Sequence, residues 1–172
     1  MTLPYRVPGI IEILAQPNDQ ACWATAFTMM KSWKDQASCE IATALGTVGQ
    51  QYVDLLNSNS PLSASQFGSF LADAGMQHLA PQDLTIDGWL QQLVDHGPIW
   101  VGTMNSLNPP AGLHSRLVRG IKGDGTAAGT SFEMIDPDGG RTYDEAVNDF
   151  VKKYDDAYTA SGDDQYIQIR FY

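Results

Sequence analysis

The chain has 172 residues, of which 43% are hydrophobic and 17% are charged, and its formal net charge is −10. This length and composition predict a single globular domain over residues 1–172 and exclude a largely disordered chain. The acidic balance, with no basic patch among interleaved aromatic residues, argues against nucleic-acid or anionic-membrane partners. No apolar run approaches about 18 residues, so no membrane-spanning segment is predicted.

Residues 1–16 lack the basic and then apolar pattern of a secretory signal, which predicts a cytoplasmic protein or one exported without a standard signal. Two partners are compatible with this N-terminal pattern. One is a larger polypeptide that contains the domain, and the other is a dedicated secretion machine. Cys22 and Cys39 are the only cysteines, so a disulfide framework is not expected and a reducing compartment is favoured. A single bridge between the two stays open.

The N-terminal part of the chain leads to a cysteine at a predicted helix start. Residues 5–14 are apolar and compatible with β structure, which predicts an extended lead-in to a loop at Gln16. Cys22 then opens a run with apolar positions at helical spacing, so its sulfur is expected at or just before a helix N-terminus. The helix dipole and unpaired N–H groups at that position favour a thiolate.

Three further helical stretches precede residue 98. The first covers residues 39–56. The second begins with a capping-box pattern of Ser63 and Gln66 and carries an apolar stripe over residues 67–74. The third has its stripe over residues 86–94, ahead of a Gly-Pro stop. The aromatic residues in these stripes are interpreted as core and not as a ligand cage.

Short β-rich runs predominate from residue 98 onward and predict an antiparallel sheet. They cover residues 99–104, 113–121, 130–135 and 166–171. A loop containing Pro109-Pro110 and a Gly-rich turn separate the first three. Thr142 and Glu145 form a second capping-box pattern, which predicts a late helix with an apolar face reaching Tyr154. Helices followed by strands predict an α+β fold.

If Cys22 is a nucleophile, one of the three histidines must serve as its base. His78 lies in a predicted loop, and His96 ends a predicted helix, where an imidazolium offsets the helix dipole. His114 begins a predicted strand after a Pro/Gly loop, where it can face a helix N-terminus and accept the thiol proton. The ordinary alternatives are a partly buried strand histidine and, for Cys22, a small buried hydrophobe.

A third group would orient the imidazole by accepting a hydrogen bond from its other nitrogen. Asp136 is the candidate because it ends a strand that a hairpin brings beside His114, and Asp138 is its competitor. Both also fit ordinary Asp-Pro and Asp-Gly turns. Gln16 precedes Cys22 by six residues, and its amide can donate to a developing oxyanion.

No cofactor and no metal site are predicted. Asp136 and Asp138 lack the spacing of an EF-hand calcium loop. The sequence also contains no short-spaced pair of histidine and cysteine residues of the kind that binds zinc.

Five short motifs occur in a characteristic order along most of the chain. They are Gln16, Cys22-Trp23-Ala24, residues 97–102, His114 at a strand start that closes with Gly120-Ile121, and Ile135-Asp136-Pro137. This combination resembles the bacterial papain-like cysteine peptidases, a group that includes secreted effectors and toxin-processing peptidases. The resemblance spans the chain from about Ile11 to the terminal strand.

The resemblance implies a papain-like fold, in which an N-terminal helical lobe carrying the cysteine helix packs on a C-terminal antiparallel sheet. It implies Cys22 as nucleophile, His114 as general base and then acid, Asp136 as the orienting residue and Gln16 in the oxyanion hole. The implied substrate is a protein or peptide, cleaved through a thioester. Two features depart from the pattern: residues 19–21 lack the plant papain signature, and Ser115 follows the histidine where many relatives have a small apolar residue.

Other functions use the same three groups. A cell-wall amidase differs from a peptidase only in substrate, and a deamidase or acyltransferase would release ammonia or give transfer products. A papain-like binding module without activity would contain an inert Cys22. Trp23 and Trp100 are expected to have packing roles. The alternatives are that Trp23 walls the cleft beside Cys22 and that Trp100 supports the strand next to His114.

Overall fold

The computed structural model describes residues 2–108 and 111–172, so the predicted Pro109-Pro110 pair lies outside the described residues. The elements in chain order are β1 (Tyr5–Arg6), α1 (Cys22–Asp35), α2 (Ile41–Gly46), α3 (Gln50–Asn57), α4 (Ala64–Asp73), β2 (Gln77–Leu79), α5 (Ile86–His96), β3 (Ile99–Met104), β4 (Leu113–Gly123), β5 (Thr130–Asp136), β6 (Arg141–Ala146), α6 (Val147–Ser161), a 3-10 turn (Asp164–Tyr166) and β7 (Ile169–Phe171). The predicted α+β class is confirmed.

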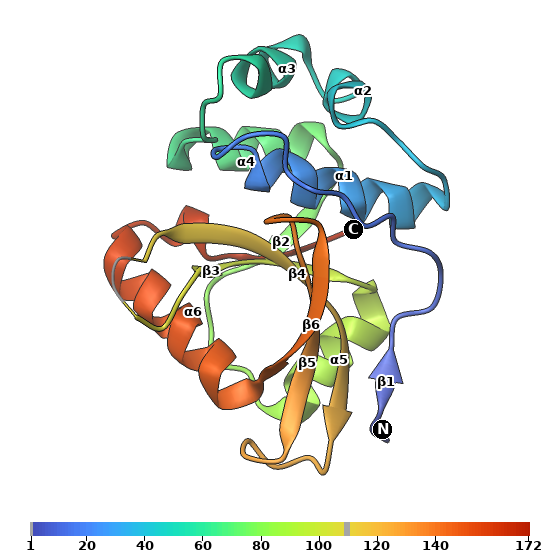
Figure 1. Cartoon of the computed structure of the whole chain (residues 1–172), viewed down its shortest axis with the longest axis vertical. Coiled ribbons are helices and arrows are strands. Elements are labelled where there is room, and N and C mark those ends of the chain that lie inside the picture. The colour runs from blue at the N-terminus through green and yellow to red at the C-terminus, as the bar shows by residue number, and fades with distance from the viewer. Residues whose placement is uncertain (1, 109–110) are drawn as a thin grey trace.

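An antiparallel sheet forms the centre of the molecule. Its strand order is β2-β7-β3-β4-β5-β6, and β1 pairs separately with β4. Figure 1 shows α1 to α4 on one side of this sheet and α5 and α6 on the other. Because side chains alternate across a strand, each strand supplies apolar residues to both layers. On β3, for example, Trp100 joins the core beneath α1 to α4, and Val101 joins the core against α5 and α6.

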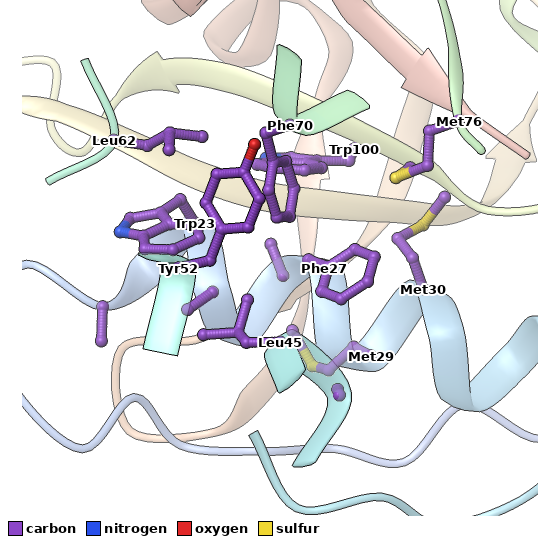
Figure 2. Close-up of a cluster of buried hydrophobic side chains, with 14 of the residues drawn as sticks. Trp23, Phe27, Met29, Met30, Leu45, Tyr52, Leu62, Phe70, Met76 and Trp100 are labelled. Carbon is purple, nitrogen blue, oxygen red and sulfur yellow. The ribbon is translucent and has the colours of Figure 1, made fainter. Parts of the chain in front are cut away.

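The core between the sheet and α1 to α4 is built on aromatic contacts. Phe70 of α4 meets Trp23, Phe27 and Tyr52 edge-on, with ring centroids 5.5, 5.0 and 4.9 Å apart. Trp100 reaches the same cluster from β3, as Figure 2 shows. Edge-to-face pairs of this kind add to the energy of burial. The helix that begins at Cys22 is therefore fixed against the sheet along its buried face.

The segment 39–56 was predicted as one helix, and the structure corrects this to two, α2 and α3. The Leu45 carbonyl accepts hydrogen bonds from both Val48 and Gly49, each at 2.9 Å, and this closes the first helix. Gly49 is extended and directly precedes α3. Glycines at positions 46 and 49 weaken helix propagation, so packing sets separate directions for the two short helices.

The predicted capping box of Thr142 and Glu145 is wrong, because both residues lie in strand β6 and α6 begins only at Val147. Gly139 and Gly140 adopt positive φ angles of 73° and 59°, which turn the chain back on itself. The following residues then pair with β5 along its whole length. Pairing with the neighbouring strand of this hairpin overrides the helix signal of residues 142–145.

The extended lead-in predicted over residues 5–14 contains one short strand, Tyr5–Arg6, which pairs with β4. The strand Gln77–Leu79 was not predicted; it pairs with β7, so His78 lies in a strand and not in the predicted loop. The predicted strand 166–171 is shorter, since Asp164–Tyr166 forms a 3-10 turn and the strand begins at Ile169. None of the helices within residues 2–108 and 111–172 is long and apolar enough to cross a membrane.

Candidate active site

Cys22 is the first residue of α1, as predicted. Ala21 precedes it without a side-chain cap, and its carbonyl accepts the Thr25 N–H at 2.9 Å. The N–H groups of the first turn have no partners within the helix and give this end a positive partial charge. The thiol is partly buried, and neither it nor that of Cys39 is in a disulfide. Cys22 therefore has a local setting that stabilises a thiolate.

His114 and Asp136 meet across the pair of strands β4 and β5. Leu117 lies opposite Ile135 in this ladder. Extending the register by one residue puts Arg116 opposite Asp136, and His114 shares that face because it lies two residues from Arg116. The His114 Nε2 atom is 2.6 Å from Asp136 Oδ1. The register of the sheet thus creates the predicted imidazole–carboxylate contact.

Asp138 has a different role from Asp136. Its backbone N–H donates to Asp136 Oδ1 at 2.9 Å, whereas its own carboxylate contacts Arg141 at 2.9 Å. The side chain of Asp138 is 66% exposed and that of Asp136 only 5%. Of the two aspartates that the sequence left open, Asp136 is the one that contacts the imidazole.

The three groups shift one another's protonation. Burial alone would raise the pKa of Cys22, but His114 and the N–H and hydroxyl of Ser115 outweigh it and lower that pKa. Burial alone would lower the pKa of His114, but its hydrogen bonds to Asp136 and Cys22 raise it to about 9. Against its own desolvation, Asp136 has a lowered pKa, chiefly because of His114. The shifts favour the thiolate form of Cys22 and the imidazolium form of His114.

Gln16 is held beside the Asp136 turn. Its backbone N–H donates to the Pro137 carbonyl at 2.8 Å, and its Nε2 donates to the Asn18 carbonyl at 2.9 Å. An amide nitrogen has two hydrogens, so one remains for a ligand. Gln16 also lines a cavity together with Cys22 and His114. One hydrogen of the Gln16 amide is thus used in the bond to Asn18, and the other remains available to donate to a ligand in this cavity.

Two cavities of about 420 Å³ each share Cys22 and His114 in their walls. The first is mainly apolar and is walled by Trp23, Leu62, Phe67, Leu113 and Tyr166, among others. The second is mainly polar and is lined by Gln16, Asp19, Asn105, Asp138 and Arg141, among others. An extended chain can therefore cross the Cys–His pair with an apolar group on one side and polar groups on the other.

The remaining candidate residues lie elsewhere. His96 ends α5 as predicted and stacks on Phe171, with centroids 3.8 Å apart. His78 belongs to an edge strand, and Trp100 is buried in the core. Residues 2–108 and 111–172 contain no group of three or more His, Cys, Asp or Glu side chains that could hold a metal ion.

The sequence patterns did not indicate the residues that contact the second oxygen of the Asp136 carboxylate. Tyr143 and Arg141 both lie 3.4 Å from Asp136 Oδ2. Arg116 is 1% exposed and donates to the Tyr143 hydroxyl at 2.6 Å. The available signal was a charged residue within the apolar strand 113–121, because a buried charge requires partners. Tyr143 itself falls within the segment that was predicted to form the late helix, whereas it lies in strand β6.

A thiol beside an imidazole, which a carboxylate contacts in turn, is an arrangement that can attack a carbonyl carbon. A family model described as papain-like cysteine protease AvrRpt2 matches residues 3–155, a range that contains all four candidate residues. A search of curated proteins found no match.

Proposed function

The chain belongs to the family of the papain-like cysteine protease AvrRpt2, and from this premise we propose that it hydrolyses peptide bonds through a thioester on Cys22. The family indicates a cysteine protease in general terms. The individual roles of Cys22, His114, Asp136 and Gln16 belong to the proposal. The observation that carries it is the His114–Asp136 contact of 2.6 Å at the mouth of a cleft that also holds the thiol.

In the first step, the Cys22 thiolate attacks the carbonyl carbon and forms a carbon–sulfur bond. The Cys22 N–H and the remaining hydrogen of the Gln16 amide stabilise the oxyanion. The tetrahedral species collapses as the carbon–nitrogen bond breaks, and His114 gives its proton to the leaving amine. Asp136 keeps the imidazole in place by accepting from Nε2, so Nδ1 is the nitrogen that exchanges the proton.

In the second step, water attacks the thioester while His114 takes one of its protons. The carbon–sulfur bond breaks, a carboxylic acid leaves, and the thiolate–imidazolium pair is restored. The same residue thus acts first as acid and then as base. No cofactor is required for either step.

The cleft supports a peptide as substrate. Its apolar cavity includes Trp23, Phe67 and Leu113, which suits an apolar side chain near the scissile bond. The polar cavity on the other side of the thiol suits backbone and polar groups of the same chain. We further propose a role as a bacterial effector or toxin-processing protease, active as a single domain.

Product analysis distinguishes the proposed peptidase from its alternatives. A diverse peptide library incubated with the protein should yield chains cut at internal bonds, detected by mass spectrometry. Ammonia released from glutamine would indicate a deamidase, transfer products would indicate an acyltransferase, and cleavage of cell-wall peptides alone would indicate an amidase.

Two cysteine variants provide the matched control. Cys22→Ala should abolish cleavage, whereas Cys39→Ala should retain it because Cys39 lies outside both cavities that meet at His114. Cleavage that survives Cys22→Ala would overturn the assigned nucleophile. No product from any substrate class would favour the inactive binding module.

A further inference from the structure

A buried polar cluster lies directly behind the Asp136 carboxylate. Its centre is Arg116, whose guanidinium donates to Thr103 Oγ1 from Nε at 3.0 Å and from Nη2 at 2.6 Å. Nη1 donates to both carboxylate oxygens of Glu145, at 2.9 and 3.1 Å. Lys153 also donates to Glu145. These contacts fix the guanidinium in place and compensate its buried charge.

The same Arg116 determines where the Tyr143 hydroxyl points its hydrogen. Nη1 of Arg116 donates to the Tyr143 oxygen at 2.6 Å. A guanidinium has only donors, so the tyrosine oxygen must accept this bond and direct its own hydrogen elsewhere. Asp136 Oδ2 lies 3.4 Å away and is an acceptor. The chemistry of the arginine therefore orients the hydroxyl toward the carboxylate.

Asp136 consequently has both oxygens engaged. Oδ1 is next to His114 Nε2 and accepts the Asp138 N–H, whereas Oδ2 faces Tyr143 and Arg141. A carboxylate that is contacted at one oxygen alone can turn about its Cβ–Cγ bond, because that torsion is broad. Contacts at the second oxygen restrict this rotation and keep Oδ1 directed at the imidazole.

We propose that Tyr143, oriented by Arg116, is a positioning residue that holds Asp136 so that Asp136 in turn holds His114 against Cys22. The proposal rests on the proposed function, because it assigns a task to the same site. Tyr143 lines neither of the two cavities that meet at Cys22, so it acts through Asp136 and not on substrate.

Arg141 is a weaker candidate for the same task. Its side chain is 58% exposed and is shared between Asp136 and Asp138. Exposed ion pairs contribute little and are screened by salt. The Tyr143 hydroxyl, in contrast, accepts a hydrogen bond from the buried Arg116. Tyr143 is therefore a more rigid support for Asp136 than the exposed Arg141.

The test replaces Tyr143 by phenylalanine, which removes only the hydroxyl. Tyr52→Phe is the matched control, because Tyr52 also contacts a carboxylate, that of Asp73 at 2.9 Å, but lies in α3 away from the cleft. Two readouts are compared with wild type: iodoacetamide alkylation of Cys22 across pH, and the proton resonance of the His114 Nε2–H. Circular dichroism checks that each variant is folded.

Loss of one hydrogen bond is expected to slow alkylation of Cys22 at mildly acidic pH by about fivefold in Tyr143→Phe. The His114 resonance should shift or broaden in this variant and stay unchanged in Tyr52→Phe. A Tyr143→Phe protein that matches wild type in both readouts, or moves no further than Tyr52→Phe, overturns the positioning role. A wild-type Cys22 that titrates as an ordinary thiol instead overturns the thiolate–imidazolium pair itself, and with it both proposals.

Discussion

His114 lies between a thiol and a carboxylate, and both partners favour its protonated form. Its pKa rises from the ordinary histidine value of 6.5 to about 9. The contribution of this residue to stability is therefore complete below the unfolded value and disappears as the pH rises through the folded one. The pKa of Cys22 is lowered at the same time. The proposed mechanism requires the imidazolium of His114, so activity should fall on the alkaline side as His114 loses its proton.

The first prediction concerns the acceptor of the imidazole. Asp136→Asn removes the negative charge that supports the imidazolium, so the alkaline limit of peptide hydrolysis should move to lower pH and the rate should fall roughly a hundredfold. Asp138→Asn is the control, since the Asp138 side chain faces Arg141 and its backbone N–H is unchanged. Equal losses in the two variants would contradict the assignment of Asp136.

Sequence could identify the residue types of the site but not their partners. Asp136 and Asp138 are only two residues apart in one turn, so the sequence alone could not decide which of them contacts the imidazole. The pairing of Leu117 with Ile135 decides for Asp136, because this register brings Asp136 beside His114. Tyr143 was missed for a related reason, because its function depends on a strand that its local sequence did not indicate.

At the scale of elements, two helix starts were predicted correctly from signals within their own segments. The start of α1 at Cys22, and α4 with its capping box, follow from neighbouring residues alone. Strands of two or three residues, such as β1 and β2, exist because distant strands pair with them, and no local pattern announces that pairing. The segment 141–146 gave a false helix signal, because its pairing with the neighbouring strand β5 in a hairpin outweighs its local pattern.

The two predicted capping boxes give a matched pair of variants. In α4, Gln66 Oε1 accepts the Ser63 backbone N–H at 3.0 Å, so the box exists, and Ser63→Ala should lower the free energy of unfolding by about 1 kcal/mol. Thr142 is exposed in a strand and does not cap a helix, so Thr142→Ala should change the free energy of unfolding by less than about 0.5 kcal/mol. Urea denaturation measures both. The reverse order of the two effects would contradict the assignment of β6.

The whole molecule is held together by residues of the sheet that belong to the core under α1 to α4. Trp100, Leu117 and Ile135 come from three adjacent strands and share one cluster with Trp23 and the other helical residues. A helix that carries the thiol and a sheet that carries the imidazole thus depend on one core. Their relative position, and with it the distance from Cys22 to His114, is set by this packing.

Such a shared core predicts cooperative unfolding of the whole chain. Urea transitions followed by far-ultraviolet circular dichroism and by protection of Cys22 from alkylation should coincide, because loss of the common cluster removes both layers together. Two separated transitions would show that the helical part and the sheet unfold independently, and would contradict a single domain.

The most direct test of the account is the pH dependence of iodoacetamide alkylation at Cys22, measured with Cys39 as internal control and with His114→Ala alongside. We expect Cys22 to react rapidly well below the ordinary thiol pKa, and we expect His114→Ala to abolish this advantage. Cys22 reacting no faster than Cys39 in both proteins would contradict it, because no thiolate–imidazolium pair would then exist.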